Sequence, residues 1–125
     1  MENNNEQTFY KWSSANTGVP FVDANMIQLN NTGYMSNRGR QIVASFLVHD
    51  LKVNWLMGAE YFESQLIDYD PCSNYGNWLY IAGVGNDPRE DRHFNVQSQE
   101  KKYDPDRKFQ EYWLQQHAAE IMILS

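Results

Sequence analysis

The stretch from Asn37 to Leu51 constrains the fold of this chain most, because its apolar residues have the spacing of a helix face. The polar segment 37–41 is followed by five apolar residues, namely Ile42, Val43, Phe46, Leu47 and Leu51. Apolar residues three and four positions apart lie on the same side of an α-helix, and that side needs a partner to pack against. The pattern therefore predicts a helix over about 37–52 with one buried face.

Helical spacing recurs along the chain, and turn signals separate the segments. We predict helices from Pro20 to about residue 30, over 59–68, from a capping Ser73 to residue 82, and from Asp104 onward. The buried face of the last helix should contain Phe109, Tyr112, Trp113 and Leu114. No segment shows sustained alternation of period two, so we predict an all-α fold. Residues 1–8 are polar and should form a disordered lead, which leaves 9–125 as one helical domain.

The polar segment at the start of the 37–52 helix is the first candidate site. Asn37, Arg38, Arg40 and Gln41 place amide and guanidinium groups at a helix end that already carries partial positive charge. Such a group of donors suits a phosphate, or an anionic or electron-rich ring. A capped helix start followed by solvated arginines explains the same residues, and the sequence alone leaves both interpretations open.

A second polar cluster consists of Asp68, Asp70 and Asn74. Carboxylates at positions i and i+2 do not share a helix face, but at a helix end both can point at one ligand. A simple capping cluster at a turn is the alternative interpretation. His49, His93 and His117 lie far apart in the sequence without further ligands at metal-binding spacing, so we expect no metal site.

Composition limits the class of protein. The net charge of −6 and the isoelectric point near 4.9 argue against a general nucleic-acid coat, although an acidic body can carry a local basic mouth. No long apolar run indicates a membrane span, and no secretory leader precedes the first helix. The single cysteine, Cys72, fits a reducing compartment. We therefore expect an intracellular protein that is not secreted, in the cytoplasm, the nucleus or a DNA-containing organelle.

Several long sequence words resemble the C-terminal part of the FAD-binding domain of the photolyase/cryptochrome family, in particular its DASH-type branch. These words are TGVPFVDANMIQL, TGYMSNRGRQIVASFLVHDL, GAEYFESQLIDYDPCSNYGNW, AGVGNDPREDRHFN and YDP, and together they extend over about 9–114. The resemblance implies a helical fold that holds FAD in a U shape. The resemblance therefore makes the all-α prediction more specific: we expect the helical C-terminal portion of that domain.

The resemblance assigns cofactor-binding roles to five residues. Asn37 would face adenine or substrate, and Arg40 would sit against the flavin and pair with Asp68. Asp68 and Asp70 would contact the isoalloxazine edge and the ribityl and adenine side. Asn74 would sit beside flavin N5 and tune the redox states of the flavin, which gives it a catalytic role as well.

The resemblance also implies electron transfer through tryptophans. Trp78 and Trp55 match the first two members of the family's tryptophan chain, and Trp12 could stand in as an outer donor. Ordinary core packing is the alternative role for such indoles.

By resemblance the substrate is DNA that contains a cyclobutane pyrimidine dimer, with single-stranded DNA favoured because base flipping costs less there. Arg38, Gln41 and Tyr80 match positions that line the mouth of the lesion cavity. Blue light would excite reduced FAD, and one electron would split the dimer, which is the reaction of a carbon–carbon lyase.

The chain departs from the family pattern in its extent. The antenna domain and the N-terminal half of the FAD domain have no counterpart, and QQHAAEIMILS replaces the usual C-terminal continuation. We therefore expect one wall of a flavin pocket, with apolar and aromatic exposed surface and with the missing half or a partner chain completing it. A flavin photoreceptor module without repair activity and a truncated fragment without autonomous activity are the alternatives.

Overall fold

The computed structural model describes residues 2–68, 70–82 and 96–124 of the chain. Its elements are α1 (Glu2–Ser13), α2 (Pro20–Thr32), α3 (Asn37–Ser45), the π-helix η1 (Phe46–Asp50), α4 (Trp55–Gln65), α5 (Pro71–Ala82), α6 (Val96–Tyr103) and α7 (Lys108–Leu124). No strand occurs within these ranges, so the all-α prediction is confirmed. Within the same ranges, no helix combines the length and apolar character needed to cross a membrane.

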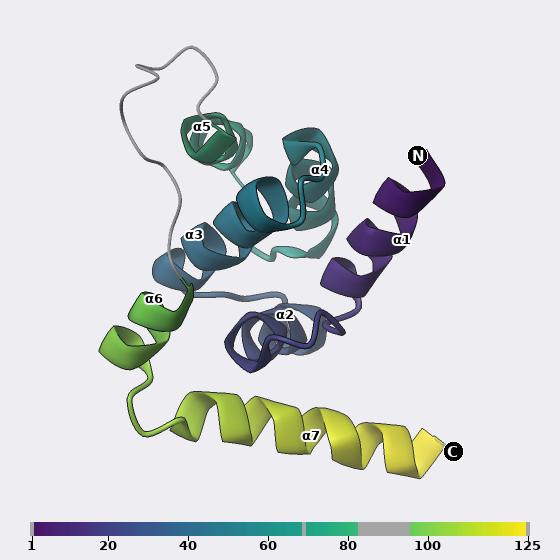
Figure 1. Ribbon diagram of the computed structural model, residues 1–125, viewed down its shortest axis with the longest axis vertical. Coiled ribbons are helices and arrows are strands. Elements are labelled where there is room, and N and C mark those ends of the chain that lie inside the picture. The colour runs from purple at the N-terminus through teal and green to yellow at the C-terminus, as the bar shows by residue number, and fades with distance from the viewer. Residues whose placement is uncertain (1, 69, 83–95, 125) are drawn as a thin grey trace.

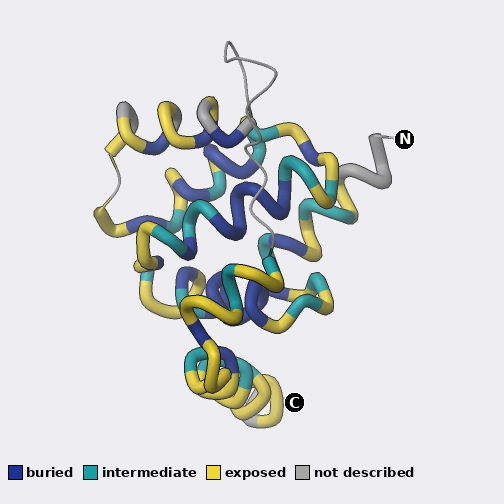
Figure 2. Tube along the Cα trace, turned by 60° about the vertical axis from the view of Figure 1, so that its left-hand side comes forward, coloured by how far each residue is buried: buried dark blue, intermediate teal, exposed yellow. Residues whose placement is uncertain are grey.

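Helix α3 occupies the middle of the fold (Figure 1). It packs against α2 on one side and α5 on the other, while α4 packs against α5 and α7 lies along α2. Buried residues concentrate in α2 and α3, whereas most of α7 is exposed (Figure 2). The helix that the sequence pattern identified first is therefore the element around which the others pack.

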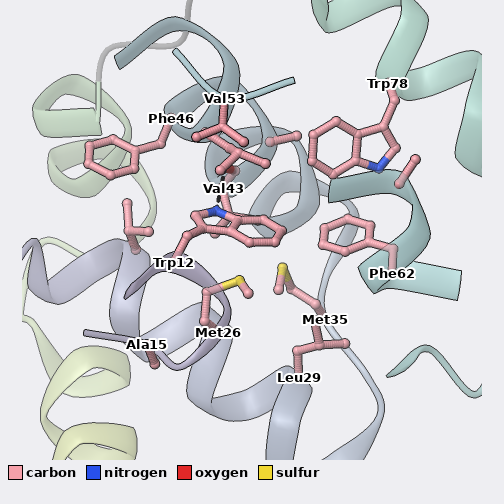
Figure 3. Close-up of a cluster of buried hydrophobic side chains, with 14 of the residues drawn as sticks. Trp12, Ala15, Met26, Leu29, Met35, Val43, Phe46, Val53, Phe62 and Trp78 are labelled. Carbon is pink, nitrogen blue, oxygen red and sulfur yellow. Dashed lines mark hydrogen bonds between the residues drawn. The ribbon is translucent and has the colours of Figure 1, made fainter. Parts of the chain in front are cut away.

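The indole of Trp12 lies at the centre of the hydrophobic core (Figure 3). Its Nε1 donates a hydrogen bond of 3.0 Å to the backbone carbonyl of Val43 on α3, which satisfies the one polar atom of the ring. The ring stacks on Phe62 of α4, with 6.0 Å between centroids. Trp12 is fully buried, so its predicted place as an outer donor at the surface is wrong.

The predicted 37–52 helix changes its geometry partway. The α-helix ends at Ser45, and the next turn is a π-helix in which the Leu51 N–H donates to the carbonyl of Phe46, five residues earlier. Asn54 then caps α4 by accepting a hydrogen bond from the Leu56 N–H at 2.9 Å. Helix α4 consequently begins at Trp55, four residues before the predicted start at residue 59.

Two other predicted helix starts are wrong. Helix α5 begins at Pro71, and the Ser73 hydroxyl lies in its first turn, where it donates to the Asp70 carboxylate at 3.0 Å instead of capping. Helix α7 begins at Lys108, because the Asp104 carboxylate accepts the backbone N–H groups of residues 109 and 110, each at 3.1 Å. A buried acidic cap thus separates α6 from α7.

Three further expectations either differ from the structure or concern residues that the structure does not describe. Helix α1 begins at Glu2, inside the predicted disordered lead. Tyr112 is 55% exposed, so its assignment to the buried face of the last helix is wrong. The sequence also predicts a loop at 83–88 and an apolar anchor at Phe94, and both lie outside the described residues.

Candidate functional site

A pocket of about 280 Å³ opens between α3, α5 and the connection from α4 to α5. Its floor is apolar and its rim is polar. The floor consists of Ala44, Phe62, Leu66, Trp78 and Ile81, and the rim of Asn37, Arg40, Gln41, Asp68, Asp70, Ser73, Asn74 and Asn77. The apolar and aromatic surface that the sequence predicted therefore forms the floor, while polar groups border it.

Arg40 is held in place by three different contacts. Its Nε donates to the carbonyl of Met35 at 2.7 Å, and one terminal nitrogen lies 2.9 and 3.0 Å from the two carboxylate oxygens of Asp68. The guanidinium also lies over the ring of Tyr34, 5.9 Å from its centroid. A planar guanidinium with several fixed donors can satisfy these contacts at once. The result is an oriented positive charge at the pocket rim.

The position of Asp68 depends on a tight junction between two loops. The backbone N–H of Ile67 donates to the carbonyl of Gly33 at 2.9 Å, so the segment after α4 is tied to the end of α2. Gly33 has φ of 75°, and a Cβ there would lie 2.6 Å from Cγ1 of Ile67. Glycine therefore provides both the left-handed helix cap and the close approach. This junction brings Asp68 within reach of Arg40.

Asn74 and Trp78 come from successive turns of α5. The Asn74 Nδ2 donates to the carbonyl of Ala59 at 3.0 Å, and because that carbonyl can only accept, the bond fixes which way the amide points. Trp78 is 1% exposed and meets Phe62 edge-on, with 5.1 Å between centroids. Both side chains line the pocket. The family word around Asn74 thus supplies a fixed amide and a buried indole to one wall.

The start of α3 combines features of both interpretations of the segment 37–41. The side chain of Ser36 accepts a hydrogen bond from the Gly39 N–H at 3.0 Å, so the helix is capped by a serine. Asn37 follows at the exposed first position and lines the pocket. Arg40, one turn on, is held by Asp68. The capped-start interpretation is correct for the backbone, but Arg40 is paired with Asp68 instead of solvated.

The structure brings together some predicted site residues and separates others. Gln41 lines the pocket, whereas Arg38 lies in a different hollow, with its guanidinium 5.1 Å from the centroid of the Tyr103 ring. Trp55, half-buried, packs against the core from the first residue of α4. The side chain of Tyr80 lies outside the described residues.

Sequence reasoning gave no role to several residues of the pocket. Asn77 lies three positions after Asn74, a spacing that places both amides on one side of α5 and that could have identified it. For Ser73 the sequence predicts only a capping role. Phe62 and Leu66 carry no chemical signal, and helical spacing identified them only as core residues.

The residues of the pocket fit part of an FAD molecule. Ligand sites combine an apolar lining for ring faces with a few fixed polar groups, and the floor and rim of this pocket have that composition. Sites that enclose a ligand have volumes of roughly 300–1,000 Å³. At about 280 Å³ this pocket is slightly smaller than that range, so it is too small to enclose a dinucleotide by itself.

Comparison with known proteins identifies the protein family to which this chain belongs. The description of the matching family is "FAD binding domain of DNA photolyase", and the match extends over residues 1–120. The chain belongs to this family, and FAD is the cofactor of the domain. The predicted resemblance is therefore confirmed.

Within the family, the chain is similar to curated DASH cryptochromes. The chain is 60% identical over 111 residues to cryptochrome DASH, chloroplastic/mitochondrial, of Arabidopsis thaliana, a match that covers 89% of this chain and 20% of that protein. It is 58% identical over 106 residues to cryptochrome DASH of Synechocystis, covering 85% of this chain and 22% of the relative.

Solved structures show the same relation. The cryptochrome of Synechocystis superimposes with a TM-score of 0.84 at 57% identity, covering 87% of this chain and 23% of that one. An archaeal photolyase from Sulfolobus tokodaii, solved with two FAD molecules, gives a TM-score of 0.82 at 45% identity, covering 88% and 26%. The chain thus spans about a fifth to a quarter of the length of its relatives.

Proposed function

We propose that this chain forms one wall of the FAD site of a blue-light-driven DNA photolyase of the DASH type, which repairs cyclobutane pyrimidine dimers. The observation that carries the proposal is the convergence of Arg40, Asp68, Asn74 and Trp78 on one pocket. Bound FAD, reduced and excited by light, would supply the electron that splits the dimer. The chain would act inside the cell, with the remainder of the flavin domain completing the site.

The rim residues have distinct tasks under this proposal. Arg40 provides a fixed positive charge that stabilises negative charge on the flavin, and Asp68 holds that guanidinium in place. Asn74 presents an amide whose orientation is set by Ala59. Asp70 and the exposed Asn37 supply further polar contacts to the cofactor.

A second group of residues serves electron transfer and DNA. Trp78 and Trp55 carry electrons toward the flavin, and the burial of Trp78 against the pocket favours this task. By family resemblance, Gln41, Arg38 and Tyr80 are the candidate residues for contact with DNA that contains the lesion, and of these Gln41 lines the pocket. Arg38 adds positive charge next to α6, where a phosphate of single-stranded DNA can approach.

The first test is cofactor retention. The purified chain is incubated with FAD and desalted, alone and together with the remaining part of a DASH cryptochrome produced as a separate chain. We expect a flavin absorption band to stay with the protein, at least in the mixture, and to be lost with Arg40→Ala and Asn74→Ala. Lys101→Ala, an exposed change on α6, is the matched control. Absence of bound flavin from both preparations would contradict the proposal.

The second test is repair. The flavin-loaded mixture is illuminated with blue light in the presence of single-stranded DNA that carries one thymine dimer, and restored thymines are counted by chromatography. Repair that depends on light and on Asn74 supports the full proposal. Flavin binding without repair would replace it with the photoreceptor alternative.

A further inference from the structure

Three aromatic side chains form a continuous path from the pocket to the outer side of α4. The rings of Trp78 and Trp12 are 6.2 Å apart between centroids, and those of Trp12 and Tyr61 are 5.7 Å apart, both in edge-on geometry. Such separations are those of aromatic rings in contact. Trp78 lines the pocket, and both indoles are buried. Figure 3 shows the two rings in the hydrophobic cluster. The path therefore begins at the pocket wall and crosses the core.

Trp12 is placed so that an oxidised indole would keep its proton. An indole that loses an electron becomes far more acidic than the neutral ring, and in contact with water it normally releases its N–H proton. Here the Nε1 of Trp12 donates to the Val43 carbonyl at 3.0 Å, and the residue is fully buried. A backbone carbonyl accepts a hydrogen bond but is not a base that takes the proton. The oxidised ring therefore stays a cation, which readily accepts an electron from a neighbour.

Tyr61 ends the path where the core meets solvent. Its ring is half-buried against Trp12, and its hydroxyl contacts the side-chain oxygen of Asn30 and the Ser13 carbonyl, the latter at 3.1 Å. Asn30 is exposed, so water reaches this end of the ring. Burial raises the pKa of Tyr61 above its ordinary value of 10.0, and the phenol is neutral at physiological pH. A neutral phenol at the edge of the core can give up an electron and a proton together.

We propose that Trp78, Trp12 and Tyr61 form an electron-transfer branch whose outer donor is Tyr61. Oxidised Trp78 takes one electron from Trp12, and oxidised Trp12 takes one electron from Tyr61. The phenolic proton passes to solvent water, so that both indoles are restored and a neutral phenoxyl radical remains on Tyr61. Under the proposed function, on which this branch rests, Trp78 is first oxidised by giving an electron to the light-excited oxidised flavin.

The transfer can be tested without any flavin. A laser flash at the red edge of the protein absorption ionises tryptophan and leaves tyrosine untouched, and transient absorption then follows the tryptophan and phenoxyl radicals. The starting chain carries Tyr112→Phe, because Tyr112 lies 4.9 Å from Trp113 and would give a phenoxyl signal of its own. We expect the tryptophan signal to decay as a phenoxyl signal grows.

The decisive comparison is Tyr61→Phe, which keeps the ring beside Trp12 and removes the oxidisable hydroxyl. We expect this variant to lose the phenoxyl signal, while Tyr10→Phe, a change at a side chain that is 70% exposed on α1, retains it. Trp12→Phe should also lose the signal, and circular dichroism checks that this variant is folded. A phenoxyl signal that is unchanged in Tyr61→Phe, or absent from the starting chain, overturns the branch. Failure to bind FAD would overturn the proposed function alone, since the flash experiment contains no flavin.

Discussion

At the scale of single residues, the phenol of Tyr61 makes the stability of the fold depend on pH in the alkaline range. Burial raises its pKa, and the hydrogen bond with Asn30 offsets part of the rise. The folded state therefore holds the phenolic proton more tightly than the unfolded state, so this contribution to stability is complete below pH 10 and is lost as the pH rises through the folded pKa. We expect the urea midpoint to fall above pH 10 and to fall less steeply in Tyr61→Phe. Parallel curves for both proteins would show that Tyr61 does not contribute.

Arg40 is expected to matter more for binding than for stability. The side chains of the Arg40–Asp68 pair are 21% and 56% exposed, and pairs of this kind contribute about 1 kcal/mol or less. Arg40→Ala should therefore shift urea unfolding by no more than about that amount while FAD retention is lost. Arg40→Lys keeps the charge but cannot bond Met35 and both Asp68 oxygens together, so retention should be only partly restored. A large loss of stability would instead assign Arg40 to the fold.

At the scale of helices, the contact between α4 and α5 depends on the absence of a side chain at Gly58. A Cβ at Gly58 would overlap the Trp78 ring and approach Leu47, whereas one at Gly76 would meet nothing within 4 Å. We expect Gly58→Ala to destabilise by about 1–3 kcal/mol through overpacking. Gly76→Ala, in the middle of α5, should stabilise by about 0.5–1 kcal/mol. Urea unfolding with tryptophan fluorescence measures both, and equal effects would rule out a special role for Gly58.

The sequence predicted those helices whose limits are set locally. Pro20 at the start of α2 and Gly33 at its end act through their own backbone preferences, and the sequence predicts the start at Pro20 and an end near residue 30. The start of α7 was not, because its cap is the Asp104 side chain reaching forward by five and six residues. Tyr112 was assigned to the core because helical spacing identifies an apolar face but not how far its partner extends.

The residues that form the pocket could not be predicted from local sequence patterns. Arg40 and Asp68 are 28 residues apart and meet because Ile67 is tied to Gly33. Only the family resemblance implied that pairing. The path from Trp78 through Trp12 to Tyr61 joins three helices, and sequence spacing gives no sign of it. Local order was therefore predictable from physics, whereas the site depended on tertiary contacts.

At the scale of the whole molecule, the chain should behave as an incomplete domain. Ile67 is 82% exposed although it lies between Leu66 and Asp68, which both line the pocket. An apolar side chain in that position suits a surface that the remaining part of the flavin domain covers. Ile67→Ser should therefore change the stability of the isolated chain by no more than about 0.5 kcal/mol, yet weaken association with the complementing chain of a DASH cryptochrome.

Met122→Ser is the matched control, because Met122 is 77% exposed on α7 and does not line the pocket. Association is measured by sedimentation of the mixed chains with and without FAD. Saturating FAD at about a hundred times its dissociation constant should stabilise the complex by about 2.7 kcal/mol. Ile67→Ser should reduce that gain and Met122→Ser should not, because only Ile67 is adjacent in the chain to residues that line the pocket. Equal losses from both changes would mean that apolar exposure in general, and not the surface at Ile67, drives the association.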